Sequence, residues 1–184
     1  MFRVLIIFFL INFYSPVFSS AKDAIISQMQ LTNNLSFNFI QTINSKNESG
    51  KCIIEYPKKI WCLYDDFNKK IIVSNGQSLV IKTENKGSYH LYPLNKTPLE
   101  FLLDKEYLIA EMKILDPREI DNQYLNFSFF ENNNLINIFF DKKNLSLVGW
   151  QTEDIYQNLA ITFISSIKRN KKINKKIFIL PKNN

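Results

Sequence analysis

Residues 50–76 read GKCIIEYPKKIWCLYDDFNKKIIVSNG, and apolar and polar residues alternate over short segments of this stretch. Period-two alternation predicts half-buried strands, and Pro57-Lys58-Lys59 and Asn75-Gly76 predict tight turns between them. Two runs of alternate positions would share one face of a hairpin: Cys52, Ile54 and Tyr56, followed by Ile60, Cys62 and Tyr64. The stretch holds no catalytic group, so we interpret it as part of an antiparallel sheet that could enclose an apolar ligand.

The beginning of the chain has the three parts of a secretory signal peptide. Arg3 supplies the positive charge, Val4 to Phe13 form an apolar run, and Ser19-Ser20-Ala21 offers a cleavage site. The alternative is a membrane anchor, but the run is shorter than the ~20 apolar residues of a spanning helix. We therefore expect a signal peptide over residues 1–21 and a single exported domain over residues 22–184.

The chain is basic, with a formal net charge of +6. Basic proteins can bind nucleic acid, but the lysines are scattered here and an exported protein rarely meets nucleic acid, so we expect no such partner. One true basic cluster lies between Lys168 and Lys176. It has two interpretations, a solvated loop or a patch for an anionic partner or membrane surface.

The chain has two cysteines, Cys52 and Cys62. Export places them in an oxidising compartment, where thiols tend to pair, and the alternation puts them on one face of neighbouring strands. A disulfide is therefore one expectation and two buried free thiols are the other. The spacing is not that of a Cys-x-x-Cys motif, and the single histidine, His90, lies far along the chain, so we expect no redox or metal site.

The rest of the chain predicts a mainly β protein with a few short helices. Ala24 to Asn33 has the apolar spacing of an amphipathic helix. The Thr97-Pro98-Leu99-Glu100 segment predicts a capping box, with helix continuing from Phe101 to Met112. We expect strands over residues 35–39, 52–56, 60–64, 71–74, 79–83, 89–92, 125–130, 135–140, 145–152, 161–167 and 177–180.

These elements predict one mainly β (α+β) domain, a strongly curved antiparallel sheet with a few helices inserted between its two halves. One face of alternating strands must be covered, and short helices can cover a concave sheet only partly, which leaves a cavity or a mobile lid. An enzyme is not expected, because the only material for one is Asp65-Asp66, Glu153-Asp154 and His90, and consecutive carboxylates on a strand point to opposite faces. We expect no cofactor and no metal.

Several motifs, in order and at matching spacing, resemble those of the periplasmic outer-membrane lipoprotein carriers, the LolA family. Their positions in this chain are Phe39-Ile40-Gln41, Gly50 with Pro57, Tyr64, Ile72-Val73-Ser74-Asn75-Gly76, Thr97-Pro98-Leu99, Asp141-Lys142-Lys143-Asn144-Leu145 with Trp150 and Asp154, and Phe178 with Pro181. The chain departs from the family where Tyr56 replaces an Arg implicated in holding the lid closed, and where Trp61-Cys62 replaces Arg-Trp. The related acceptor family, LolB, consists of lipoproteins, and Ser15 to Asp23 contain no lipoprotein cysteine.

The resemblance implies an unclosed, strongly curved antiparallel β half-barrel with a lid of short helices over a hydrophobic cavity. It also implies a monomeric periplasmic carrier. Its cargo would be the acyl chains of lipoproteins, collected from an inner-membrane lipoprotein-releasing ABC complex and delivered to an outer-membrane lipoprotein acceptor. The alternative is another periplasmic half-barrel that binds lipid or glycolipid or senses envelope stress. We expect the cavity wall to include Leu35, Phe37, Phe39, Ile54, Tyr56, Ile60, Cys62, Tyr64, Leu99, Leu102 and Leu103.

Two of these residues carry more specific expectations. Tyr56 should contact the lid by packing and one hydroxyl hydrogen bond, which would make lid opening almost independent of ionic strength. Ile60 should lie at the cavity mouth, where a charged replacement could remain hydrated in the empty protein.

Overall fold

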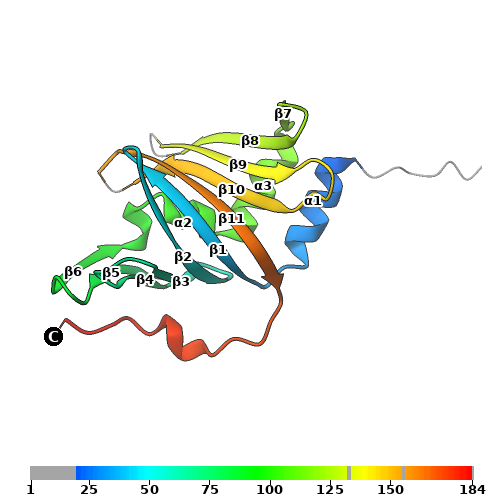
Figure 1. The fold of residues 1–184 in the computed structure, drawn as a ribbon. Helices are drawn as coiled ribbons and strands as arrows, with labels where there is room; N and C mark the ends of the chain where they lie inside the picture. Colours follow the sequence, from blue (N-terminus) through cyan, green and yellow to red (C-terminus); the bar gives the residue numbers. More distant parts are fainter. Residues whose placement is uncertain (1–19, 132–133, 155, 184) are drawn as a thin grey trace, which may run out of the picture.

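The computed structural model describes residues 20–131, 134–154 and 156–183, and within them eleven strands form one antiparallel sheet (Figure 1). The predicted signal peptide lies outside the described residues except for Ser20 and Ala21. The first half of the sheet is a meander of β1 (Asn34–Ile43), β2 (Lys46–Glu55), β3 (Lys59–Tyr64), β4 (Lys70–Asn75), β5 (Ser78–Thr83) and β6 (Ser88–Pro93). The second half contains β7 (Arg118–Ile120), β8 (Tyr124–Glu131), β9 (Asn134–Asp141), β10 (Leu147–Glu153) and β11 (Leu159–Arg169).

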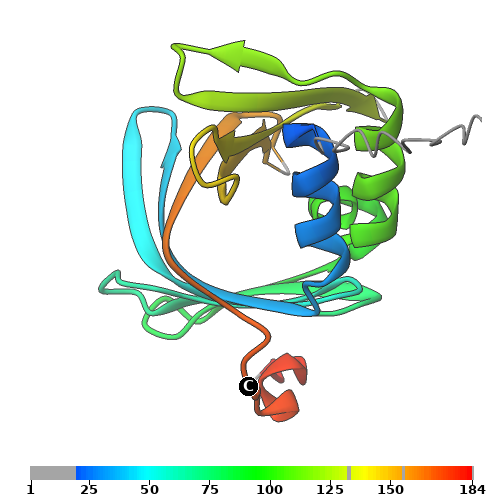
Figure 2. The same ribbon diagram turned by 90° about the vertical axis from the view of Figure 1, so that its right-hand side faces the viewer.

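The two halves join where β1 pairs with β11, so the order across the sheet is β6-β5-β4-β3-β2-β1-β11-β10-β9-β8-β7. The sheet curves strongly but does not close, because β6 and β7 remain at its two edges (Figure 2). The chain between these edges forms η1 (Leu94–Lys96), α2 (Leu99–Leu103) and α3 (Lys105–Ile114), which lie on the open side together with α1 (Ala21–Gln30). We call α1, α2 and α3 the lid helices.

Alternation along the strands places the core on the concave face, under the lid helices. In β3, Ile60, Cys62 and Tyr64 are buried while the residues between them are half-exposed. β2 has room only for a glycine at position 50, because a Cβ there would clash with the Leu63 carbonyl and lie 2.9 Å from the Phe39 ring. The predicted half-barrel is therefore the fold of this protein.

The C-terminal segment covers part of the convex face. The segment predicted as a strand at 177–180 instead overlaps the end of a 3₁₀ helix, η2 (Lys175–Phe178), which lies against β3 and β4. Phe178 is buried outside the main core, as are Val73 and Val80 on the convex side of the sheet. The strand prediction is wrong because these apolar residues pack onto the face of the sheet instead of joining its edge.

The helix starts differ from the sequence predictions. α1 begins earlier than predicted, at Ala21, where Ser20 and Asp23 form a capping box. The capping box predicted at Thr97 is absent from α2: the Thr97 hydroxyl donates to the Leu94 carbonyl at 2.8 Å, and α2 has no side-chain cap. None of the described helices is long and apolar enough to cross a membrane.

Candidate functional site

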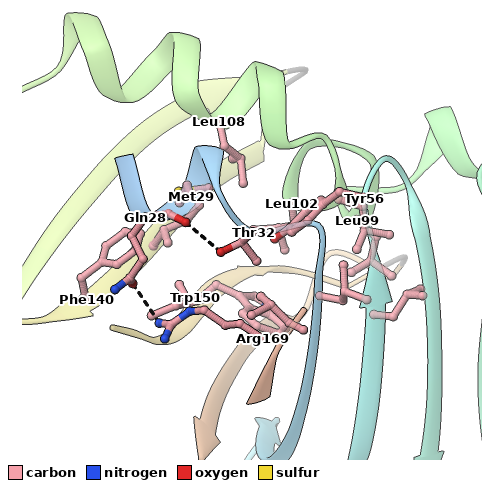
Figure 3. Close-up of a pocket in the computed structure, with 16 residues that line it drawn as sticks. Gln28, Met29, Thr32, Tyr56, Leu99, Leu102, Leu108, Phe140, Trp150 and Arg169 are labelled. Carbon is pink, nitrogen blue, oxygen red and sulfur yellow. Dashed lines mark hydrogen bonds between the residues drawn. The ribbon is translucent and has the colours of Figure 1, made fainter. Parts of the chain in front are cut away.

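A cavity of about 50 Å³ lies between the concave face of the sheet and the lid helices (Figure 3). We call it the lid cavity. Most of its wall is aliphatic or aromatic, and Arg169 is the one charged residue in that wall. The lining residues are Gln28, Met29, Thr32, Leu35, Ile54, Tyr56, Ile60, Leu99, Leu102, Leu103, Leu108, Ile138, Phe140, Leu147, Trp150 and Arg169.

The hairpin of β2 and β3 builds one side of the lid cavity. Its register sets Cys52 opposite Cys62 and Ile54 opposite Ile60, on one face as the alternation predicts. The turn contains a cis bond before Pro57, and Lys58 there has a φ of 63°. Tyr56, just before this turn, lines the cavity with Leu99 and Leu102 of α2.

The Tyr56 ring packs against the lid helices. Burial raises the pKa of its hydroxyl to about 12, and the Lys105 ammonium of α3 lies 6.0 Å from the ring centroid. The hydroxyl has no hydrogen-bond partner among the residues that the structure describes. The packing expectation for Tyr56 is therefore met, whereas the expected hydroxyl hydrogen bond is not.

Lys58, two residues further on, provides the polar contact with the lid. Its Nζ donates to Glu100 Oε1 at 2.8 Å and lies 3.2 Å from Asp104 Oδ2, while its backbone N–H donates to the Leu103 carbonyl at 2.8 Å. The hydrogen bond to Glu100 raises the pKa of Lys58 above its ordinary value; burial opposes this effect, and Asp104 adds to it. Lid closure thus includes ion pairs at Lys58, a contact that the sequence analysis did not consider.

A second, larger cavity of about 340 Å³ lies at the other end of the half-barrel, and we call it the distal cavity. Its position follows from the β1–β11 register: Leu35, opposite Arg169, lines the lid cavity, whereas Ile43, opposite Ala160, lines the distal one. The distal cavity is lined by Gln41, Ile43, Tyr64, Lys70, Ile72, Leu79, Ile81, Ser88, His90, Tyr92, Thr97, Pro98, Leu99, Trp150, Thr152, Glu153, Asp154, Tyr156 and Ala160.

Two residues, Leu99 and Trp150, line both cavities and so lie between them. Within the described part of the chain, the Thr152 hydroxyl is buried beside the distal cavity without a hydrogen-bond partner. The two cavities together form the lumen of the half-barrel, and its walls are mainly apolar.

The eleven residues expected on the cavity wall fall into three groups. Seven line the lid cavity: Leu35, Ile54, Tyr56, Ile60, Leu99, Leu102 and Leu103. Tyr64 lines the distal cavity. Phe37, Phe39 and Cys62 are buried in the core without lining either cavity.

The expectation for Ile60 needs correction. Ile60 is only 3% exposed, so it lies inside the wall and not at a hydrated mouth. Its neighbours across the strands, Ile54 and Ser74, are also buried. A charge at position 60 would therefore be desolvated even in the empty protein.

Cys52 and Cys62 are joined by a disulfide on the concave side of the hairpin. The bond links directly opposed residues of β2 and β3, so it fixes the strand register next to Ile54 and Ile60. Its place in the core, facing away from the convex surface, gives it a structural role beside the lid cavity.

The residues considered for an enzyme do not form a joint site. Asp154 accepts hydrogen bonds from the backbone N–H groups of Tyr156 and Asn158 and so holds a turn. His90 is exposed on the edge strand β6, and Asp65 is exposed on the turn after β3. The described residues contain no group of three His, Cys, Asp or Glu side chains that could hold a metal ion.

Sequence reasoning missed Lys58, Arg169 and the distal cavity. The partners of Lys58 lie more than 40 residues away in α2 and its flank, so no local pattern marks them. A β-bulge in the pairing of β1 with β11 interrupts the strand alternation and brings Arg169 into the lumen.

Comparison with known proteins agrees with this fold. An uncharacterized conserved protein from Thermus thermophilus is similar over 89% of this chain and 96% of its own, with a TM-score of 0.52 and 6% identity. A LolA superfamily protein from Nitrosomonas europaea is similar over 88% of this chain and 99% of its own, with a TM-score of 0.48 and 8% identity. A putative outer membrane lipoprotein-sorting protein domain from Vibrio parahaemolyticus is similar over 87% of this chain and 97% of its own, with a TM-score of 0.48 and 7% identity.

At such low identity the Thermus likeness supports the fold alone. No curated protein matches the chain. The family model of the outer membrane lipoprotein carrier protein LolA matches residues 30–180. This match spans both halves of the sheet, α2, α3 and η2, and the chain belongs to the LolA family.

Proposed function

We propose that this protein is a periplasmic carrier that holds the acyl chains of lipoproteins between the sheet and the lid helices. It would receive them from an inner-membrane lipoprotein-releasing ABC complex and deliver them to an outer-membrane acceptor. The observation that carries the proposal is the apolar lumen, with a lid cavity whose lining residues come from both the sheet and the helices. Membership of the LolA family supports it.

The chemistry of such cargo explains why a carrier needs no catalytic group. Exposing an acyl chain to water costs about 0.8 kcal/mol for each CH₂. An apolar lumen removes that cost, and transfer requires only that the acceptor bind the chain more tightly. Leu99, Leu102 and Leu103 would cover the chain from the lid, and Leu35 and Ile54 would contact it from the sheet.

The size of the lid cavity implies that cargo binding moves the lid helices. Its volume of about 50 Å³ is smaller than the ~150 Å³ cavity that admits benzene in another protein. An acyl chain therefore requires the helices to move away from the sheet. Displacement of Leu99 and Trp150 would then connect the lid cavity with the distal cavity and lengthen the available lumen.

The test is release of lipoproteins from spheroplasts by the purified protein, combined with mass spectrometry of what it binds. We expect acylated lipoproteins to leave the membrane in a complex with the protein. Leu99→Glu should abolish release, because a carboxylate between the two cavities opposes an apolar chain. Leu91→Glu provides the matched control, because Leu91 is 55% exposed on β6 and should retain release.

Folding of both variants is checked by thermal unfolding. A folded wild-type protein that releases no lipoprotein would contradict the carrier proposal. Recovery of a glycolipid or another lipid in place of lipoproteins would instead favour the alternative of a different lipid-binding half-barrel.

A further inference from the structure

The wall of the lid cavity contains one cation, Arg169, in otherwise uncharged surroundings. Arg169 Nη2 donates to the side-chain carbonyl Oε1 of Gln28 at 2.8 Å, which links β11 to α1 (Figure 3). None of the ion pairs among the described residues involves Arg169. A half-buried guanidinium without a carboxylate partner is unusual, because charged groups away from water are normally paired.

A β-bulge directs Arg169 into the lumen. Along β11, Ala160, Thr162 and Ile164 are buried, and continued alternation would turn Arg169 outward. The register with β1 shifts between Ser36 and Asn38, where two residues of β11, Ser166 and Ile167, lie opposite one residue of β1. The extra residue reverses the alternation, so Arg169 lies opposite the buried Leu35.

The bulge has a local cost. Ser166 adopts a φ of 54°, a left-handed conformation that is uncommon for a residue other than glycine and costs of order 1 kcal/mol. Bulges often occur beside functional sites, where they change the direction of a side chain. Here the result is a guanidinium that faces an apolar cavity, with a single neutral partner on the lid.

We propose that Arg169, held by Gln28, is the head-group subsite of the lumen. It would bind acceptor oxygens at the polar end of an acyl ligand, most tightly when those oxygens are anionic, as in a carboxylate or a phosphate. The planar guanidinium can donate two parallel hydrogen bonds to such a group. This inference rests on the proposed binding of acyl chains and adds the chemistry and position of the polar end.

The distal cavity gives the ligand a direction. Arg169 and Ala160 lie at opposite ends of the β1–β11 pairing, opposite Leu35 and Ile43. Eight residue steps along a strand span about 27 Å. A chain held by its polar end at Arg169 would therefore extend past Trp150 toward the distal cavity.

The test uses Trp150 as the reporter. The chain has two tryptophans, and Trp61 alternates with the buried, concave-facing residues of β3, so it lies on the convex face; Trp61→Phe leaves Trp150 as the single tryptophan. In this background, dodecanoate, dodecyl phosphate and dodecanol are titrated below their micelle concentrations. We expect at least one anionic ligand to bind about tenfold more tightly than dodecanol, the effect of one or two hydrogen bonds to a charged group.

Arg169→Gln should remove this preference, because it weakens binding of the anionic ligand much more than binding of dodecanol. Lys168→Gln is the matched control: Lys168 is exposed and lies opposite the outward-facing Ser36, so the same charge is removed outside the lumen. Tighter binding of dodecyl phosphate would identify a phosphate head group, and tighter binding of dodecanoate a carboxylate. Both results support the subsite.

The outcomes separate the subsite from the carrier function. If all three ligands bind equally, or if Arg169→Gln weakens all three alike, Arg169 only positions α1 and the subsite proposal is overturned while acyl binding stands. If none of the ligands binds the folded wild-type protein, the proposed carrier function itself fails.

Discussion

Two of the contacts between the lid helices and the sheet differ in chemistry. At the β2–β3 hairpin, Lys58 forms ion pairs with Glu100 and Asp104 and a backbone hydrogen bond with Leu103. At β11, Arg169 forms a single hydrogen bond with the neutral side chain of Gln28. One contact therefore depends on charge on both sides, and the other does not.

Chain connectivity explains the difference. α1 leads directly into β1 through residues 31–33, so covalent structure keeps it near the sheet. Lys58 and Glu100 are 42 residues apart, and α2 reaches the hairpin only through non-covalent contacts. Ion pairs thus occur where connectivity provides no tether, which leaves the guanidinium of Arg169 available for a ligand.

The largest effect on stability is expected where the β2–β3 hairpin forms the wall of the lid cavity. Ile60→Glu would place a carboxylate at a position that is 3% exposed. We expect it to lower the free energy of unfolding by more than about 3 kcal/mol, because the charge is desolvated without a cation partner. Chemical denaturation measures the loss.

Two controls accompany Ile60→Glu. Ile60→Val should cost about 0.5–1.5 kcal/mol, since it removes one methyl group from the core. Ile40→Glu should change stability by less than about 0.5 kcal/mol, because Ile40 is 56% exposed. Wild-type stability of Ile60→Glu would show that position 60 becomes hydrated and that the wall is wrongly placed.

The second effect concerns the rigidity of the hairpin that holds α2. The paired variant Cys52→Ser with Cys62→Ser opens a loop with a sequence separation of 10. We expect the free energy of unfolding to fall by about 2–3 kcal/mol, mainly because the unfolded chain gains conformational freedom. Thermal unfolding with and without a reductant measures it, and the serine variant should not respond to the reductant. An equal response of both proteins would contradict a disulfide in the folded protein.

The third effect tests the charged contact itself. Lys58→Met should weaken closure of α2 by about 1 kcal/mol, the upper range for exposed ion pairs. Hydrogen exchange of the α2 amides measures it. Added salt should speed exchange in the wild type, because it screens the ion pairs, and should have little effect in the variant.

Lys59→Met is the control for Lys58→Met. Lys59 pairs with Glu55 at 3.6 Å within the hairpin and not with the lid, so exchange in α2 should stay close to wild type. Equal acceleration by both variants would mean that general charge loss, and not the Lys58 contact, controls the lid.

The fourth effect is the dependence of closure on alkaline pH. The pKa of Lys58 in the folded protein is raised above its ordinary value of 10.5, chiefly by Glu100. Its contribution is therefore complete below pH 10.5 and is lost as the pH rises through the raised value. Burial likewise raises the pKa of Tyr56 to about 12, so its ionisation favours the open lid over the same range.

Exchange of the α2 amides should thus accelerate above pH 10.5 beyond the ordinary effect of base on exchange. Lys58→Met with Tyr56→Phe should remove this excess. An unchanged excess in the double variant would assign the opening to other groups.

The sequence predicts the sheet well because strand alternation and turn residues are local signals. The alternation in residues 50–76 places Cys52, Ile54, Ile60 and Cys62 on one face of the hairpin, and the structure sets them in directly opposed pairs. Local signals fail where distant parts of the chain meet. Phe178 belongs to a segment with strand-like apolar content, yet it packs on the convex face, because its partners lie in β3 and β4.

The candidate site was only partly accessible from the sequence for the same reason. Aliphatic wall residues follow from alternation, so Leu35 and Ile54 could be placed on the lumen side. Arg169 could not, because the bulge at Ser166 reverses the alternation beyond Ile164. The role of Lys58 depends on carboxylates that come close only in the folded chain.

The smallest effect is expected at the neutral contact. Gln28→Met removes the hydrogen bond to Arg169 while keeping a side chain of similar length and good helix propensity. We expect a loss of about 0.5 kcal/mol, at the low end for a hydrogen bond, because the half-buried Arg169 keeps access to water. The loss should not depend on salt, since no carboxylate takes part.

Gln30→Met, at an exposed position of the same helix, is the control and should match the wild type in its free energy of unfolding. If Gln28→Met proves salt-dependent, or costs more than Lys58→Met, then α1 and not α2 carries the charged closure, and the contrast between the two contacts is reversed.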